Sequence, residues 1–519
     1  MVSTTAGYIT DVDYIPGYYS HMSPVAMRYV ASLNQVLPPK ASDGSRYLEL
    51  GCGLGRSLTT IAAANPHGEF VGIDINENHI ALMNHEITAG ELSNIKALAR
   101  DFSALDAELG KFDYVAVHGV FSWVSPEVRE SLIAAVKSHL APGGLLLVSY
   151  NAMPGWAHLQ PIRGILRQYS QLRQGDSVQR IREALNYLVF IRDKKAQYFE
   201  DNPLAAAYVD SLLKQDIRYL AHEYLNEHWT SFYFSEVAGM FGAAGLSYVG
   251  SLPVYTNFWD LCVRPEFQEL FRTTSDRLVT ESHKDFCANT AFRWDIYAAE
   301  PRVMKSNRDR LKKVESLYFR VSRPGIVLPQ RVNLGVVTST VQGPVYEAVL
   351  KLLSEKCLTL DEIIHEKEVH GHNVEDVVRV VDACVAMGLV DVVSGAVPAS
   401  DSTADSEDVC VPSAFNRTVI EKDAFCGRPV ALASQLSGTG HAMGDFDVAI
   451  LHELTCGGAE GLSERVAARL AQTGRSLQRD GNPVTDEAER LQAVEAACNA
   501  FRTASIPALR QLGIVADRT

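Results

Sequence analysis

The stretch Glu49-Leu50-Gly51-Cys52-Gly53-Leu54-Gly55 stands between a short apolar run and a segment with helical spacing, and it decides the fold. Glycines between a strand and a helix let the backbone turn tightly and approach a ligand closely. The next apolar run ends near Asp74, where an acidic side chain can accept hydrogen bonds from both ribose hydroxyls of an adenosine. The loop and Asp74 together predict a site for an adenosine-containing cofactor. A tight turn beside an incidental surface acid is the less specific alternative.

Apolar runs alternate with helical segments from this loop onward. The runs are YLEL (47–50), EFVGIDI (69–75), NIKALARDF (94–102), FDYVAVHG (112–119) and GLLLVSY (144–150), and residues 78–90 and 126–140 have helical spacing. Nearly continuous apolar strands that alternate with helices are typical of a parallel sheet covered on both faces. The sequence therefore predicts an α/β protein with a Rossmann-like sheet.

The pattern changes several times after residue 150, which predicts more than one domain. A basic helical stretch over about 157–228 interrupts the α/β pattern, which returns in SEVAGMFGAAGLSYVGS (235–251) and FRWDIYA (292–298). We therefore predict one α/β domain over 1–302 with a helical insertion. Helices followed by the strand VDVVS predict a winged-helix-like domain over 303–395. A Ser-, Ala- and Asp-rich linker is expected at 396–410, and a helical C-terminal domain at 411–519.

Composition and charge exclude several classes of protein. The 519 residues carry a formal net charge of −14, which argues against nucleic acid as a partner, because duplex binding relies on lysine and arginine. None of the nine cysteines forms a C-x-x-C pair, which predicts reduced thiols in a cytoplasmic protein. From the first residues we expect no signal peptide, and because no apolar run is long enough to span a bilayer we expect no stable membrane insertion.

The type of adenosine cofactor follows from the details of the glycine loop. The pattern is Gly-x-Gly-x-Gly after an acidic residue, whereas dinucleotide sites usually show Gly-x-Gly-x-x-Gly. Asp101-Phe102 follows the third run, and Pro142-Gly143-Gly144 precedes the fifth. Together with the glycine loop, these motifs resemble, in their order, those of class I methyltransferases. The resemblance implies S-adenosyl-L-methionine as cofactor, and the matching positions are Tyr19, Glu49, Gly51, Gly53, Asp74, Ile75, Asp101, Phe102 and His118.

Motifs outside the cofactor loop carry a closer resemblance. They are His118–Val124, Tyr150–Trp156, Tyr219–Leu225 and Phe232–Phe234. Together they resemble bacterial methyltransferases with a methyltransferase regulatory domain, a group that includes rickettsial lysine methyltransferases acting on outer-membrane proteins. The resemblance implies a regulatory-type segment at about 229–302, a protein or peptide substrate, and lysine N-methylation. The family's N-terminal aromatic segment is only partly preserved, as Tyr18-Tyr19-Ser20-His21-Met22-Ser23-Pro24.

Aromatic and polar residues follow the fourth and fifth runs, where ligands of parallel sheets bind. We expect His118, Trp123, Tyr150, Asn151 and Trp156 to surround the site of methyl transfer. An aromatic rim suits a lysine ammonium group through cation–π attraction. The alternative is that these rings only pack loops onto the sheet. The Asn/Asp-Pro-Pro-Tyr/Phe motif of DNA amino-methylases is absent after the fourth run.

Other signals are weaker. His365 and His370 are too far apart in sequence to share one helix face in the manner of a zinc protease, so no metal site is predicted. The basic insertion suits a solvated face, an acidic substrate protein, or a contact in a homodimer. Two other functions remain open: a small-molecule or peptide methyltransferase, and an inactive scaffold that binds the cofactor for stability.

Overall fold

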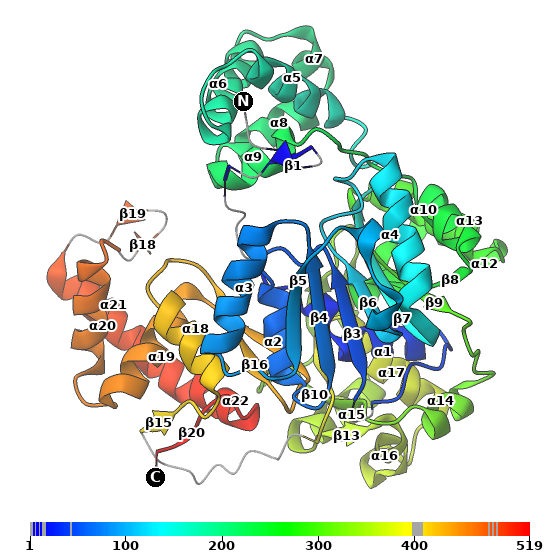
Figure 1. Cartoon of the computed structure of the whole chain (residues 1–519). Coiled ribbons are helices and arrows are strands. Elements are labelled where there is room, and N and C mark those ends of the chain that lie inside the picture. The colour runs from blue at the N-terminus through cyan, green and yellow to red at the C-terminus, as the bar shows by residue number, and fades with distance from the viewer. Residues whose placement is uncertain are drawn as a thin grey trace.

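A seven-stranded sheet forms the centre of the computed structural model (Figure 1). The structure describes all residues except 1–3, 6, 10, 13–16, 42–43, 397–407, 476–477, 480–481, 484–485 and 519. The strand order is β5-β4-β3-β6-β7-β9-β8, in which the first five strands are parallel and β9 runs antiparallel to both of its neighbours. The strands are β3 (Arg46–Leu50), β4 (Glu69–Asp74), β5 (Ile95–Ala99), β6 (Phe112–Val117), β7 (Leu140–Asn151), β8 (Leu246–Leu252) and β9 (Phe292–Ala299).

Helices cover both faces of this sheet, because side chains along each strand point alternately to opposite faces. On β3, Tyr47 joins the core beneath one helical layer, whereas Leu48 and Leu50 join the core beneath the other. The first layer is α1 (Pro24–Leu33), α2 (Arg56–Ala64) and α3 (Glu77–Ala89). The second is α4 (Pro126–His139) and α10 (Phe234–Ala243). The predicted α/β sheet is confirmed.

The connection between β7 and α10 is helical, as the sequence predicts. It packs around its own apolar core, which includes Leu166, Leu188 and Val209, and it stands beyond one end of the sheet (Figure 1). Its helices are α5 (Gln160–Gln171), α6 (Ser177–Asp193), α7 (Gln197–Asp201), α8 (Pro203–Leu212) and α9 (Ile217–Leu225). Between β8 and β9 lie α11 (Trp259–Cys262), α12 (Gln268–Thr273) and α13 (Arg277–Ala288).

Residues 303–396 pack around an apolar core of their own, at the end of the sheet opposite the helical insertion (Figure 1). The three-stranded antiparallel sheet of this region has the order β13-β10-β14, and a separate hairpin pairs β11 with β12. The elements are α14 (Asn307–Lys313), β10 (Tyr318–Val321), β11 (Gln330–Asn333), β12 (Thr338–Val341), α15 (Pro344–Glu355), β13 (Leu358–Thr359), α16 (Leu360–His365), α17 (Val374–Ala386) and β14 (Val390–Val393). The winged-helix assignment stays a prediction.

The C-terminal region is largely helical, and it also contains a hairpin of β16 (Val430–Ser434) and β17 (Thr439–Met443) that the sequence analysis missed. Residues 397–407 of the expected linker lie outside the described residues. The other elements are β15 (Val409–Cys410), α18 (Ala414–Asp423), α19 (Asp445–Gly457), α20 (Leu462–Gln472), α21 (Glu487–Ala500), α22 (Ile506–Gln511) and β20 (Ala516–Asp517). Within the described ranges, no helix is long and apolar enough to cross a bilayer.

Candidate active site

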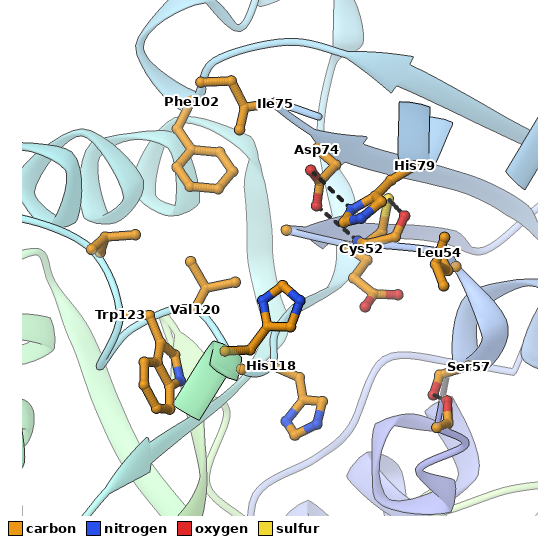
Figure 2. A pocket seen from close by; sticks show the side chains of 18 of the residues that line it. Cys52, Leu54, Ser57, Asp74, Ile75, His79, Phe102, His118, Val120 and Trp123 are labelled. Carbon is orange, nitrogen blue, oxygen red and sulfur yellow. Dashed lines mark hydrogen bonds and ion pairs between the residues drawn. The ribbon is translucent and has the colours of Figure 1, made fainter. Parts of the chain in front are cut away.

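A cavity opens at the carboxyl ends of β3, β4 and β6, where the strand order reverses and ligands of open α/β sheets bind. Figure 2 shows Phe102 and Ile75 at one end of this cavity and His118 and Trp123 nearer the other. All nine residues predicted to bind the cofactor line it, and so does Trp123. We call it the cofactor cavity; its wall also includes Gly17, Arg56, Ser57, Arg100, His222, Glu223 and Asn226.

The glycine loop and Asp74 form one wall of the cofactor cavity. Asp74 accepts hydrogen bonds from the backbone N–H groups of Gly53, at 2.8 Å, and Asn76, at 2.9 Å. Gly53 has a φ of +53°, and a Cβ atom placed there would meet no atom within 4 Å. The loop therefore leaves open space at the point where a cofactor would approach the backbone.

Gly51 has a different role from Gly53, because a side chain at this position meets the neighbouring loop. At a φ of +82°, its Cβ atom would lie 2.2 Å from Cγ2 of Val120. We expect Gly51→Ala to lower the free energy of unfolding by about 1–3 kcal/mol more than Gly119→Ala does, as overpacking usually costs. Gly119 is the matched control, with a φ of +67° and open space around its Cβ position. Equal values for both variants in chemical denaturation would contradict this contact.

The end of the cavity predicted to hold an adenine ring is apolar with one acidic edge. Ile75 is 40% exposed although it is aliphatic, and Phe102 lies beside it (Figure 2). The Asp101 carboxylate accepts hydrogen bonds from the backbone N–H and the hydroxyl of Ser103, which fix its position. An apolar surface beside a fixed carboxylate fits a flat base that carries an exocyclic amine.

Four carboxyl groups lie on the wall of the cofactor cavity. Oε2 of Glu49 is buried and has no hydrogen-bond partner among the described residues, and burial and Asp74 raise the pKa of this carboxyl well above its usual value. The wall also carries Asp74, Asp101 and Glu223. Its two arginines are engaged elsewhere, because Arg56 pairs with Asp423 at 2.6 Å and Arg100 pairs with Asp106 at 2.5 Å. The site therefore fits a ligand with positive charge better than a pyrophosphate.

His118 is held in an aromatic cluster at the end of β6. Its ring lies 4.2 Å from that of Trp294, in a stacked arrangement, and 4.1 Å from that of Tyr19. Its Nδ1 lies 2.7 Å from the Ser149 hydroxyl oxygen, which also accepts the N–H of Gly119. Burial, helped by His21, lowers the pKa of His118 to about 3. The imidazole is therefore neutral at physiological pH.

Three residues predicted to surround the transfer site do not line the cofactor cavity. Tyr150 is 1% exposed, and its hydroxyl donates to Asp295 at 2.5 Å within a buried ionic cluster. Trp156 packs against Trp229 in the core of the helical insertion. Asn151 ends β7, and its backbone N–H donates to the Ser122 hydroxyl. These positions favour the alternative that such residues pack loops and strands.

Glu223 is a residue of the cavity wall that the sequence analysis quoted only as part of a motif. It lies on α9 of the helical insertion, far along the chain from the glycine loop. Burial raises the pKa of its carboxyl to about 8, although Arg163 and the Tyr219 hydroxyl act in the opposite direction. The helical spacing of apolar residues in α9 does not indicate that the Glu223 carboxyl faces a cavity formed by another part of the chain.

Comparisons with known proteins match the central sheet and the segment from the last helix of the insertion to β9. A family described as a methyltransferase domain matches residues 48–146, and one described as a predicted methyltransferase regulatory domain matches residues 216–299. An uncharacterized protein of Synechocystis sp. is 27% identical over 98% of this chain and 99% of its own length. Another uncharacterized protein, from Rickettsia prowazekii, is 31% identical over 44% of this chain and 90% of its own length.

A solved structure has the same fold over nearly the whole chain. PKMT2 from Rickettsia typhi, in complex with AdoHcy, superposes with a TM-score of 0.72 and covers 97% of this chain and 99% of its own, at 21% identity. At this level of identity the similarity shows the fold. Because the match covers 97% of this chain, the shared architecture extends beyond the central sheet to the helical insertion and to the regions that follow β9.

Proposed function

We propose that this chain, which belongs to the class I S-adenosylmethionine-dependent methyltransferases with a methyltransferase regulatory domain, methylates lysine side chains of a protein substrate. The observation that carries the proposal is the acidic wall of the cofactor cavity, where Glu49, Asp74 and Glu223 face the same space. Such a wall suits both a sulfonium cofactor and a cationic amine as methyl acceptor.

The residues of the cavity fit S-adenosylmethionine along its whole length. Ile75, Asp101 and Phe102 would hold the adenine, and Asp74 the ribose hydroxyls. Glu49 and the loop from Gly51 to Gly53 would hold the amino-acid part, which gives the buried carboxyl of Glu49 a positively charged neighbour. The cofactor, when bound, supplies an electrophilic methyl group on a sulfonium sulfur. The chain itself aligns the acceptor and excludes water.

A lysine acceptor has to lose a proton before its nitrogen can attack, and Glu223 is the group on the wall suited to take it. Its raised pKa makes this carboxylate a stronger base than an ordinary glutamate near neutral pH. The neutral ring of His118 does not repel an ammonium group, and Tyr19 and Trp123 add aromatic surface to the same wall. We therefore propose His118, Trp123 and Glu223 as the residues around the methyl acceptor.

The similarity to PKMT2 of Rickettsia typhi supports a protein as substrate, because the motifs of this chain also resemble rickettsial lysine methyltransferases. The test is incubation of the purified chain with methyl-labelled S-adenosylmethionine and a lysate separated into protein and small-molecule pools. We expect label in the protein pool, and none with a variant that cannot bind the cofactor. Label confined to small molecules would contradict a protein substrate and support a biosynthetic methyltransferase.

A further inference from the structure

Tyr18 stands between two wall residues of the cofactor cavity, Gly17 and Tyr19, while its own side chain contacts the C-terminal region. The Tyr18 hydroxyl accepts the backbone N–H of Gly440 at 2.5 Å. It also lies 2.5 Å from the hydroxyl oxygen of Thr439, to which it can donate its own proton. Burial raises the pKa of Tyr18, so this hydroxyl stays protonated and keeps its role as donor.

The same short segment is also fixed to the start of α2. The backbone N–H of Tyr19 donates to the Ser57 hydroxyl oxygen at 3.0 Å, and the Ser57 hydroxyl donates to the carbonyl oxygen of Gly17 at 3.4 Å. Ser57 itself lines the cofactor cavity. The segment Gly17–Tyr19 therefore lies over the beginning of α2, and the side chain of Tyr18 continues from it to the β16–β17 hairpin.

A second set of contacts joins α2 directly to the C-terminal region. Arg56, the first residue of α2, places its guanidinium 2.6 Å from Oδ2 of Asp423, which is 2% exposed and ends α18. At the other end of α2, the side-chain amide of Asn65 donates to the carbonyl oxygen of Gly438 at 3.0 Å. Figure 1 shows β16 and α18 beside α2 and α3, so the hairpin and α18 support the helix that follows the glycine loop.

We infer that the C-terminal region supports cofactor binding without contacting the cofactor. Thr439, Gly440 and Asp423, together with Tyr18, are positioning residues that hold the segment Gly17–Tyr19 and the start of α2 against the cavity. None of these four residues lines the cavity, so they act through Gly17, Tyr19 and Arg56, which do. The inference concerns cofactor binding alone and does not depend on the identity of the methyl acceptor.

The test is calorimetric titration of the full chain and its variants with AdoHcy and with S-adenosylmethionine. Tyr18→Phe keeps the ring and removes the hydroxyl, and Gly440→Ala brings a Cβ atom within 2.6 Å of Thr60 and 2.7 Å of the Tyr18 ring. We expect both to raise the Kd by about 5- to 50-fold, because each disturbs buried hydrogen bonds. Gly444→Ala is the matched control, since its Cβ atom would meet only Asp447, at 3.7 Å. Wild-type affinity in Tyr18→Phe would overturn the inference.

Two further measurements separate positioning from general destabilisation. Thr439→Ser keeps the hydroxyl and should keep the wild-type Kd for the cofactor, whereas Thr439→Val should raise this Kd. Because coupling between sites is reciprocal, cofactor binding should also slow hydrogen exchange in residues 430–443 of the wild-type chain. An unchanged exchange rate there, or equal affinities for the two Thr439 variants, would overturn the inference. A failure of wild type to bind either compound would instead refute the cofactor assignment.

Discussion

Asp74→Asn is expected to weaken binding of S-adenosylmethionine by about 100-fold, since two charge-assisted hydrogen bonds of about 1.5 kcal/mol each are lost. The carboxylate of Asp74 is held by the N–H groups of Gly53 and Asn76, so it is preorganised at the end of β4. The side-chain amide of asparagine has only one oxygen that can accept hydrogen bonds. It is also uncharged, so its hydrogen bonds from the ribose hydroxyls would be weaker than those to a carboxylate. Equilibrium binding of the labelled cofactor measures the change.

The control for this variant is Glu77→Gln. Glu77 is also acidic and begins α3, three residues after Asp74, but it is exposed and does not line the cofactor cavity. We expect the affinity of this variant to stay within about twofold of wild type, because an exposed charge outside the cavity contributes little. Equal affinities for Asp74→Asn and Glu77→Gln would remove Asp74 from the cofactor site.

Glu223→Gln is expected to lower kcat/KM for the protein substrate by about 100-fold, the usual contribution of a positioned general base. The carboxyl of Glu223 titrates with a pKa of about 8, so the wild-type rate should rise with pH through this value as the carboxylate forms. The rate of the Glu223→Gln variant should not show this rise with pH. Groups that interact with the same carboxyl are Arg163 and the hydroxyls of Tyr19, Tyr208, Tyr219 and Tyr224. Burial raises the pKa of each tyrosine above its ordinary value and lowers the pKa of Arg163 only to about 10, so all of them keep their protons through this range.

The same pKa shift makes a prediction about stability. The folded-state pKa of Glu223 lies above the ordinary value of 4.5, so the protonated carboxyl is favoured in the fold. Its contribution to stability is complete below pH 4.5 and is lost as the pH rises through about 8. Glu223→Gln should therefore lose less stability than wild type over this range. The control is Glu227→Gln, which changes an exposed glutamate after α9. If the rate and the stability of Glu223→Gln depended on pH in the same way as those of Glu227→Gln, the proposed role of Glu223 would be contradicted.

The parallel part of the sheet could be predicted because each strand carries its own local signal. The strands that end at Leu50, Asp74 and Val117 are apolar and short, and a glycine or asparagine suited to a turn or to a helix N-terminus follows each within two residues. The grouping of Gly51, Gly53, Asp74, Asp101 and Phe102 around one cavity could be predicted for a similar reason, since each of them ends or follows a strand of this sheet. The carboxyl ends of parallel strands meet at one edge, so the order along the chain indicates proximity in space.

The parts of the site that could not be predicted come from packing between distant segments. Tyr150 looks like a site residue because it ends a strand, but its side chain points into the buried cluster of Asp295 and Arg293. Tyr18 carries no local signal of its position, because its partner Thr439 lies 421 residues further along the chain. Glu223 carries none either, because the cavity that it faces is formed largely by residues outside the helical insertion. The hairpin of β16 and β17 was missed because its short strands lie within a region of helical composition.

The most direct test of the central claim is amino-acid analysis of the labelled protein substrate after acid hydrolysis. Methyl transfer to a lysine nitrogen forms a carbon–nitrogen bond that survives hydrolysis, so label should elute with methylated lysine. The label should fall sharply with Asp74→Asn enzyme at a cofactor concentration near the wild-type Kd. Label released as a volatile product, as from a methyl ester, or label that elutes with a methylated residue other than lysine would contradict the account. Such a result would keep the cofactor site and reject the proposed acceptor.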